Sequence, residues 1–92
     1  INMGSQTAIK GMPLAGPYVA SKVAVHSLTT TIYLENTRNV TCNAIVPGII
    51  DTPANRQNMP AADPAGWVSL EAIANKIEEL ICSNQNGELV LI

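Results

Sequence analysis

One short segment, residues 40–46, most constrains how this chain can fold. Its sequence, VTCNAIV, is a mostly apolar run that ends at Pro47-Gly48. A continuous apolar run of strand length, without alternation of polar and apolar residues, is typical of a strand buried on both faces of a parallel sheet. The segment therefore predicts a central strand with other layers of chain covering both of its faces.

The segments on either side of this strand alternate between strand and helix patterns. Further strands are expected at 1–3 and 89–92, and helices at 18–36 and 70–83. Pro17 suits the first turn of the earlier helix, and Ser69 is predicted to be the N-cap of the later one. Crossovers of this length favour parallel pairing. The predicted fold class is therefore α/β, with the order strand-helix-strand-helix-strand of the C-terminal half of a Rossmann-like, doubly wound parallel sheet.

The composition suggests that more chain covers this surface. Charged residues make up 13% of the 92 residues, against about 25% in a typical globular domain. A self-contained domain of this size has a high ratio of surface to volume and needs more polar covering. The chain also contains no glycine-rich turn of the kind that holds a dinucleotide pyrophosphate. We therefore expect residues 1–92 to be a single partial domain from which the N-terminal dinucleotide-binding half is absent.

Charge and cysteine content exclude several classes of function. The net charge is −2 and no basic cluster occurs, so nothing favours nucleic-acid binding. No apolar run approaches the roughly 18 residues that a membrane span needs. Cys42 and Cys82 are far apart and the chain has one histidine, which excludes the usual zinc spacings and predicts no metal site. Two reduced thiols predict a cytoplasmic protein.

Tyr18 and Lys22 are the first pair that could carry chemistry. They lie four residues apart at the start of the helix expected at 18–36, a spacing that places both side chains on one face. A positive charge close to a phenol favours the phenolate, which can exchange a proton with a bound molecule. The pair recurs by chance in proteins, so its meaning depends on what surrounds it.

Two loops fall where ligands bind in such sheets. Gly4-Ser5 and Pro47-Gly48 follow strands, and parallel α/β sheets bind ligands at the carboxyl ends of their strands. The long connection at 49–66 contains several prolines and is expected to serve as a functional loop, such as a lid. His26, one turn beyond Lys22, is expected at the helix surface or at an interface. Trp67 is expected to anchor packing, with a possible second role as a wall of a substrate pocket.

The helix at 18–36 is expected to be buried on more than one side. Val25, Leu28 and Ile32 form one apolar stripe, and other apolar residues populate the remaining faces. If one face packs on the sheet, the opposite face is left to meet a partner subunit.

These motifs together resemble the C-terminal half of a short-chain dehydrogenase/reductase. The matching elements are Ser5 thirteen residues before Tyr18, the Tyr18/Lys22 pair, and the segment Pro47-Gly48-Ile49-Ile50-Asp51-Thr52 after the following strand. The resemblance implies an oxidoreductase in which Tyr18 is the general acid/base. It further implies that Lys22 holds the nicotinamide ribose and favours the phenolate, and that Ser5 hydrogen-bonds the substrate oxygen.

The same resemblance implies a cofactor and partners. The cofactor would be NAD(H) or NADP(H), and the residue that decides between them would lie in the absent half. Its expected contacts are Tyr18, Lys22, Pro47, Gly48, Ile50 and Thr52. The partners would be a small-molecule substrate and further copies of the chain, as a homodimer or homotetramer that forms through the helix at 18–36.

A narrower likeness leaves the substrate open. Residues 51–63 together with Trp67 resemble the corresponding segment of dihydropteridine reductases, which favours a pterin-like substrate. Those proteins generally lack the serine that Ser5 supplies here, and a serine beside the tyrosine fits a small carbonyl or alcohol. The alternative to an enzyme is a non-catalytic fragment, or a scaffold of the same fold that senses dinucleotides or forms dimers.

Overall fold

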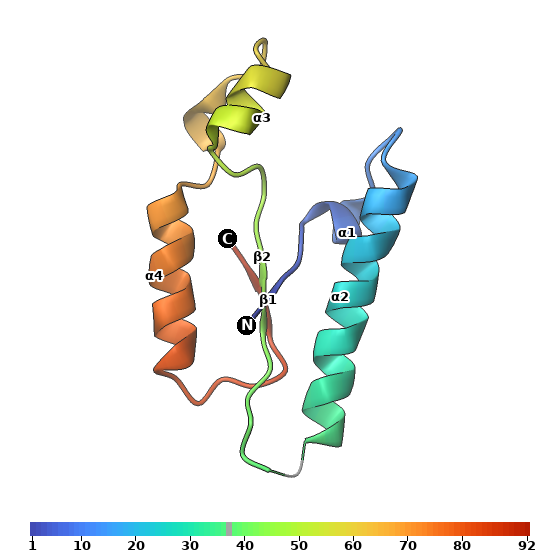
Figure 1. Cartoon of the computed structure of the whole chain (residues 1–92), viewed down its shortest axis with the longest axis vertical. Helices are drawn as coiled ribbons and strands as arrows, with labels where there is room; N and C mark the ends of the chain where they lie inside the picture. Colours follow the sequence, from blue (N-terminus) through green and yellow to red (C-terminus); the bar gives the residue numbers. More distant parts are fainter. Residues whose placement is uncertain (37) are drawn as a thin grey trace.

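The computed structural model describes residues 1–36 and 38–92 as three layers. The elements in chain order are β1 (Asn2–Met3), α1 (Thr7–Lys10), α2 (Gly16–Glu35), β2 (Ala44–Val46), α3 (Pro53–Asn58), the 3-10 helix η1 (Pro64–Gly66), α4 (Leu70–Ile81) and β3 (Leu89–Leu91). The sheet is seen nearly edge-on in Figure 1, with α2 on one side and α4 on the other. The short helix α3 lies beyond one end of the sheet.

The sheet confirms the predicted α/β class and its parallel pairing. Its order is β1-β2-β3, and both neighbouring pairs are parallel. β2 is central, with Ile45 opposite Met3 on one side and Val90 on the other. The carboxyl ends of all three strands therefore meet at one edge, where α1 and α3 also lie (Figure 1).

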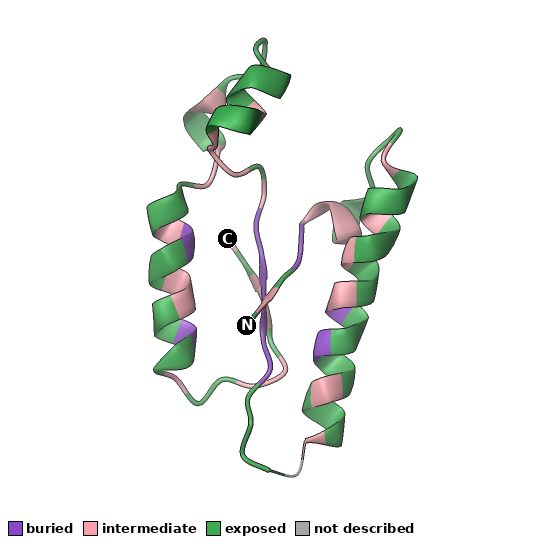
Figure 2. Cartoon of the chain, viewed as in Figure 1, coloured by how far each residue is buried: buried purple, intermediate pink, exposed green. Residues whose placement is uncertain are grey.

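The core is built around β2. Its residues Ala44, Ile45 and Val46 are fully buried, and α4 adds Ile73 and Leu80 from one side. Figure 2 shows the buried residues along β2 and on the faces of α2 and α4 that are turned toward it. An apolar strand covered by a helix on each face is the arrangement that residues 40–46 predict.

In the described part of this single chain α2 packs on the sheet through one face, and burial of a second side stays a prediction that depends on a partner subunit. Its buried residues are His26 and Thr29, both polar. Leu28, from the expected apolar stripe, is exposed, and Val25 and Ile32 are only half-buried. The helix contacts the sheet with hydrogen-bonding side chains, and exposed apolar residues such as Leu28 are left on its other faces.

Two expected boundaries also need correction. The strand predicted at 40–46 is reduced to Ala44–Val46, because Asn39 turns the chain with a φ of 59° and Val40 and Thr41 are exposed. The connection at 49–66 is not a plain loop but contains α3 and η1. Each of these short helices has a proline in its first turn after a capping Thr52 or Asp63.

The start of α4 confirms its predicted cap. The Ser69 hydroxyl accepts a hydrogen bond from the Ala72 amide at 3.0 Å, which satisfies one of the free amides of the first turn. None of the described helices combines the length and the apolar character that a membrane crossing requires.

We predict that Leu80→Ala in the full-length protein lowers the free energy of unfolding by about 3 kcal/mol, because truncating a buried leucine leaves a cavity. Leu80 is 1% exposed, whereas its neighbour Ile81 is 68% exposed. Ile81→Ala is therefore the matched control and should change stability by less than about 1 kcal/mol. Denaturant unfolding measures both, and equal losses in the two variants would contradict this packing.

Candidate active site

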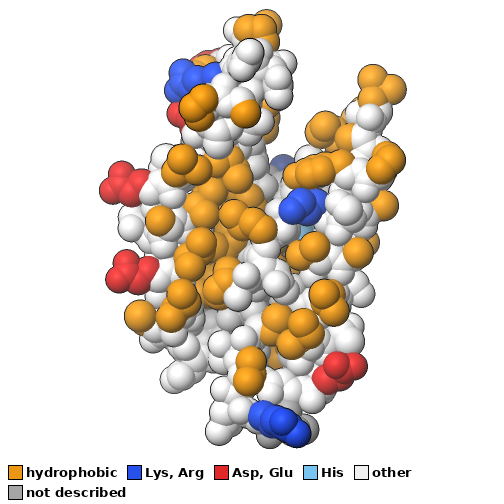
Figure 3. Space-filling model, viewed as in Figure 1, with side chains coloured by type: hydrophobic (Ala, Val, Ile, Leu, Met, Phe, Trp, Pro, Cys, Tyr) orange, Lys and Arg blue, Asp and Glu red, His pale blue; other side chains and the backbone are white. Residues whose placement is uncertain are grey.

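A pocket of about 540 Å³ lies at the carboxyl ends of β1 and β2. In Figure 3 the surface is notched at this end of the molecule, between the part that carries α3 and the part that carries α1 and the start of α2. The lining residues are Met3, Gly4, Ser5, Gln6, Thr7, Lys10, Gly11, Met12, Tyr18, Lys22, Pro47, Gly48, Ile49, Ile50, Asn55 and Met59. The pocket thus brings together Ser5, Tyr18 and Lys22 from two separate parts of the chain.

Lys22 is anchored on the strand that precedes the site. Its Nζ donates a hydrogen bond to the Met3 carbonyl oxygen at 2.9 Å and lies 5.9 Å from the centre of the Tyr18 ring. An ammonium has three donors, so this bond leaves others available to a bound molecule. Tyr18, in the first turn of α2, is exposed toward the pocket that it lines. The predicted pairing on one helix face is therefore present.

Ser5 is buried at the turn between β1 and α1. Its hydroxyl lies 2.8 Å from the Thr7 hydroxyl and accepts a hydrogen bond from the Thr7 amide at 3.2 Å. Its own amide donates to His26 Nε2 at 3.2 Å. The expectation that His26 lies at the helix surface or an interface is therefore wrong, since its ring is buried against this turn.

The segment after β2 is held in place by its neighbours. The Pro47 carbonyl accepts a hydrogen bond from the Gln6 amide at 3.0 Å, which places the two strand ends side by side. Pro47, Gly48 and Ile50 line the pocket as the resemblance implies. The Ile50 carbonyl accepts a hydrogen bond from Asn55 Nδ2 at 2.8 Å.

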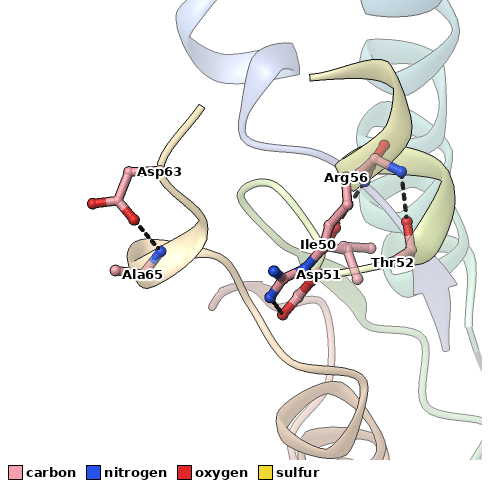
Figure 4. Close-up of polar contacts among 7 residues, drawn as sticks. Ile50, Asp51, Thr52, Arg56, Asp63 and Ala65 are labelled. Atoms are coloured by element: carbon pink, nitrogen blue, oxygen red, sulfur yellow. Dashed lines mark hydrogen bonds and ion pairs between the residues drawn. The ribbon is translucent and has the colours of Figure 1, made fainter. Parts of the chain in front are cut away.

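Thr52 is not among the residues that line the pocket. Its hydroxyl instead accepts a hydrogen bond from the Asn55 amide at 3.1 Å and caps α3 (Figure 4). As an acceptor in this cap the hydroxyl keeps its own proton to donate, so the contact of Thr52 with the cofactor stays a prediction.

Asp51 and Arg56 form an ion pair beside the pocket (Figure 4). Arg56 donates from Nε and from one terminal nitrogen to the two carboxylate oxygens, at 2.6 and 2.8 Å. These hydrogen bonds lower the pKa of Asp51 below its ordinary value of 3.8, with desolvation opposing them and the Arg56 charge assisting. The pKa of Arg56 is raised by the same contact.

Several lining residues were missed by pattern and spacing. All three methionines of the chain, Met3, Met12 and Met59, line this pocket. Methionine side chains adapt to varied apolar surfaces, so their convergence provides a flexible apolar wall. Lys10 adds a second cation, and no aspartate or glutamate is among the lining residues. The scattered methionines gave no spacing signal because they converge only through the fold.

Comparison with known proteins now identifies the family. The family model described as short chain dehydrogenase matches residues 1–63. This chain belongs to the short-chain dehydrogenase family. A 3beta-hydroxysteroid dehydrogenase from Mediterraneibacter gnavus is 32% identical over 96% of this chain and 37% of that relative. The chain therefore spans well under half the length of this relative.

Solved structures of short-chain dehydrogenases share the fold. An acetoin dehydrogenase from Enterobacter cloacae matches 99% of this chain and 39% of that chain, with a TM-score of 0.81 and 32% identity. A 4-hydroxyisoleucine dehydrogenase complexed with NADH matches 99% of this chain and 42% of that chain, with a TM-score of 0.82 and 29% identity. The likeness of residues 51–67 to dihydropteridine reductases is not shown by these comparisons and stays a prediction.

We predict that Asp51 titrates below 3.8 in the native protein and that Arg56→Gln raises its midpoint toward that ordinary value. Because the folded-state pKa is lowered, the pair stabilises the start of α3 above the ordinary pKa, and this contribution is lost as the pH falls through the lowered value. Carboxyl NMR shifts report the midpoint. Arg38→Gln removes an exposed arginine elsewhere and should leave it unchanged; an unmoved midpoint in Arg56→Gln would contradict the ion pair.

Proposed function

We propose that residues 1–92 supply the catalytic and substrate-binding half of an NAD(P)-dependent oxidoreductase. In this proposal Tyr18 is the general acid/base, Lys22 holds the cofactor ribose and keeps the phenol ready to ionise, and Ser5 donates a hydrogen bond to the substrate oxygen. The observation that carries the proposal is the convergence of Ser5, Tyr18 and Lys22 with Pro47 and the residues after it on one pocket.

The residues present fit the nicotinamide end of such a cofactor. Lys22 is fixed by Met3 while keeping donors for a ribose hydroxyl. Gly48 leaves the pocket open above the strand end, since a β-carbon there would approach nothing closer than 3.8 Å. Lys10 and Lys22, without an acidic lining residue, favour an anionic molecule.

When bound, the cofactor supplies or accepts a hydride, and the chain's own residues handle the proton. For reduction of a carbonyl, its carbon gains the hydride while the Tyr18 O–H bond breaks and the proton moves to the carbonyl oxygen. Oxidation of an alcohol reverses both transfers. Lys22 stabilises the phenolate that remains, and this electrostatic contribution is largest where water is excluded.

The proposed substrate is a small carbonyl or alcohol compound. A hydroxysteroid dehydrogenase and an acetoin dehydrogenase among the relatives support it, as does a buried serine that can donate to the substrate oxygen. A pterin-like substrate is the alternative, supported by the likeness of residues 51–67 to dihydropteridine reductases. Assays with both classes of compound decide between them.

The outward face of α2 supports assembly into a homodimer or homotetramer. Val23, Leu28 and Leu34 are exposed on this helix, and exposed apolar side chains there are available for contact with another subunit. A non-catalytic scaffold that senses dinucleotides or forms dimers would use the same face, so only turnover separates the two functions. The cytoplasmic location stays a prediction that rests on the two cysteines.

We predict that Tyr18→Phe in the full-length protein lowers kcat by at least about 10²-fold, because general acid/base catalysis contributes at least that much. Cofactor binding, followed by fluorescence titration, should persist. Tyr33→Phe is the matched control, because Tyr33 lies on the same helix but is not a pocket residue. Near-normal turnover in Tyr18→Phe would overturn the catalytic role, and cofactor binding without turnover in the wild type would favour the scaffold.

We predict that Leu28→Glu dissociates the assembly, because the interface would have to bury an unpaired charge. Leu28 is 55% exposed, so the substitution should leave the subunit folded. Val40→Glu places the same charge at a residue that is 59% exposed outside α2, and serves as the control. Light scattering measures the mass of each variant. An unchanged mass in Leu28→Glu would exclude this face as the interface.

A further inference from the structure

His26 reaches from the middle of α2 to the end of β1. The residue is 8% exposed and its Nε2 accepts a hydrogen bond from the Ser5 amide at 3.2 Å. Ser5 is itself 6% exposed, so the bond lies away from solvent. The chemistry described above for the pocket uses the Ser5 hydroxyl but gives no role to this ring.

Gly4 is what allows the ring to come so close. A β-carbon at Gly4 would lie 2.3 Å from His26 Nε2 and 2.7 Å from Cδ2. The Gly4 backbone has little room to retreat, because its amide donates to the Ile45 carbonyl of the buried central strand at 2.7 Å. Any larger residue at Gly4 would therefore displace the imidazole from the Ser5 amide.

The hydrogen bond assigns a role to one ring nitrogen. Nε2 is the acceptor of the Ser5 amide proton. A buried amide that loses its acceptor carries the full cost of its desolvation. The Ser5 backbone therefore depends on His26, because no other acceptor is recorded for its amide among the described residues.

We propose that His26 is a positioning residue that fixes Ser5 relative to Tyr18. Glycine at position 4 leaves the space that the His26 ring occupies. Ser5 and Tyr18 come from different segments, and His26 shares α2 with Tyr18 while binding the Ser5 backbone. Among the described residues the Ser5 hydroxyl hydrogen-bonds only to Thr7, two residues along the same turn, so its direction follows from how the backbone of this turn is held. The inference rests on the proposed function, since it concerns where the substrate-side donor points.

The test compares two substitutions of similar size in the full-length protein. In His26→Gln the amide oxygen can take the place of Nε2, whereas His26→Met fills similar space without a strong acceptor. We expect His26→Met to lower kcat about tenfold, the effect of one hydrogen bond, with the cofactor KM unchanged. His26→Gln should recover most of that loss. Equal kcat in the wild type and in His26→Met would overturn the inference.

Gly4 provides an independent arm of the experiment. Gly4→Ala should lower both stability and kcat, because the new methyl group meets the ring. The double variant Gly4→Ala/His26→Ala should regain stability, since the clash is relieved, but should keep a low kcat because the acceptor is gone. Recovery of kcat in the double variant would show that only packing matters and would overturn the positioning role.

A control and a second readout separate this inference from the proposed function. Thr29→Val alters a buried residue one turn along the same face of α2, which contacts Asn2 rather than Ser5, and should lower stability while kcat stays at the wild-type value. Hydrogen exchange at the Ser5 amide should quicken in His26→Met and not in Thr29→Val. If Ser5→Ala keeps wild-type kcat, the proposed role of Ser5 fails; the exchange rates then decide alone whether His26 holds this backbone.

Discussion

The parallel alignment of the three strands is the constraint on which the site depends. Because β2 pairs with both neighbours in the same direction, the residues after each strand meet at one edge. Gln6 joins all three ends: its amide donates to the Pro47 carbonyl at 3.0 Å, and its side chain donates to the Ile92 carbonyl at 3.2 Å. Ser5 and Gly48 lie on either side of these contacts. Strand direction therefore sets the position of the pocket, and the segments that follow β1 and β2 complete its walls.

The helix that carries Tyr18 is held to the sheet by directional bonds. Three side chains at successive turns of α2 hydrogen-bond to β1 or to the turn after it: Lys22 to Met3, His26 to Ser5, and Thr29 to Asn2. Apolar packing tolerates small slips of a helix along a sheet, whereas hydrogen bonds lose their partners when the helix shifts. Lys22 and His26, the two contacts nearest Tyr18 along the helix, therefore set the height of Tyr18 above the strand ends.

The same polar face explains which features the sequence could predict. The central strand, the parallel order, the Ser69 cap and the Tyr18/Lys22 pair each depend on residues close in the sequence, so pattern and spacing found them. The spacing of apolar residues cannot predict a helix face that consists of Lys22, His26 and Thr29. The Gly4–His26 contact joins residues far apart in sequence. It depends on glycine having no side chain at position 4. For α3 and η1 the sequence did carry a local signal that was missed. In both, a capping residue precedes a proline, as Thr52-Pro53 and Asp63-Pro64.

The charge beside the pocket depends on the ion pair that Asp51 forms with Arg56. Asp51 comes directly after the lining residue Ile50, and its charge could oppose those of Lys10 and Lys22. Both of its oxygens are instead engaged by Arg56, so the ion pair carries no net charge. The two lysines then set the sign of the potential in the pocket, since no acidic residue lines it. The Asp51–Arg56 pair therefore adds no net charge beside a pocket lined by two lysines, which suits the negative charge of a dinucleotide.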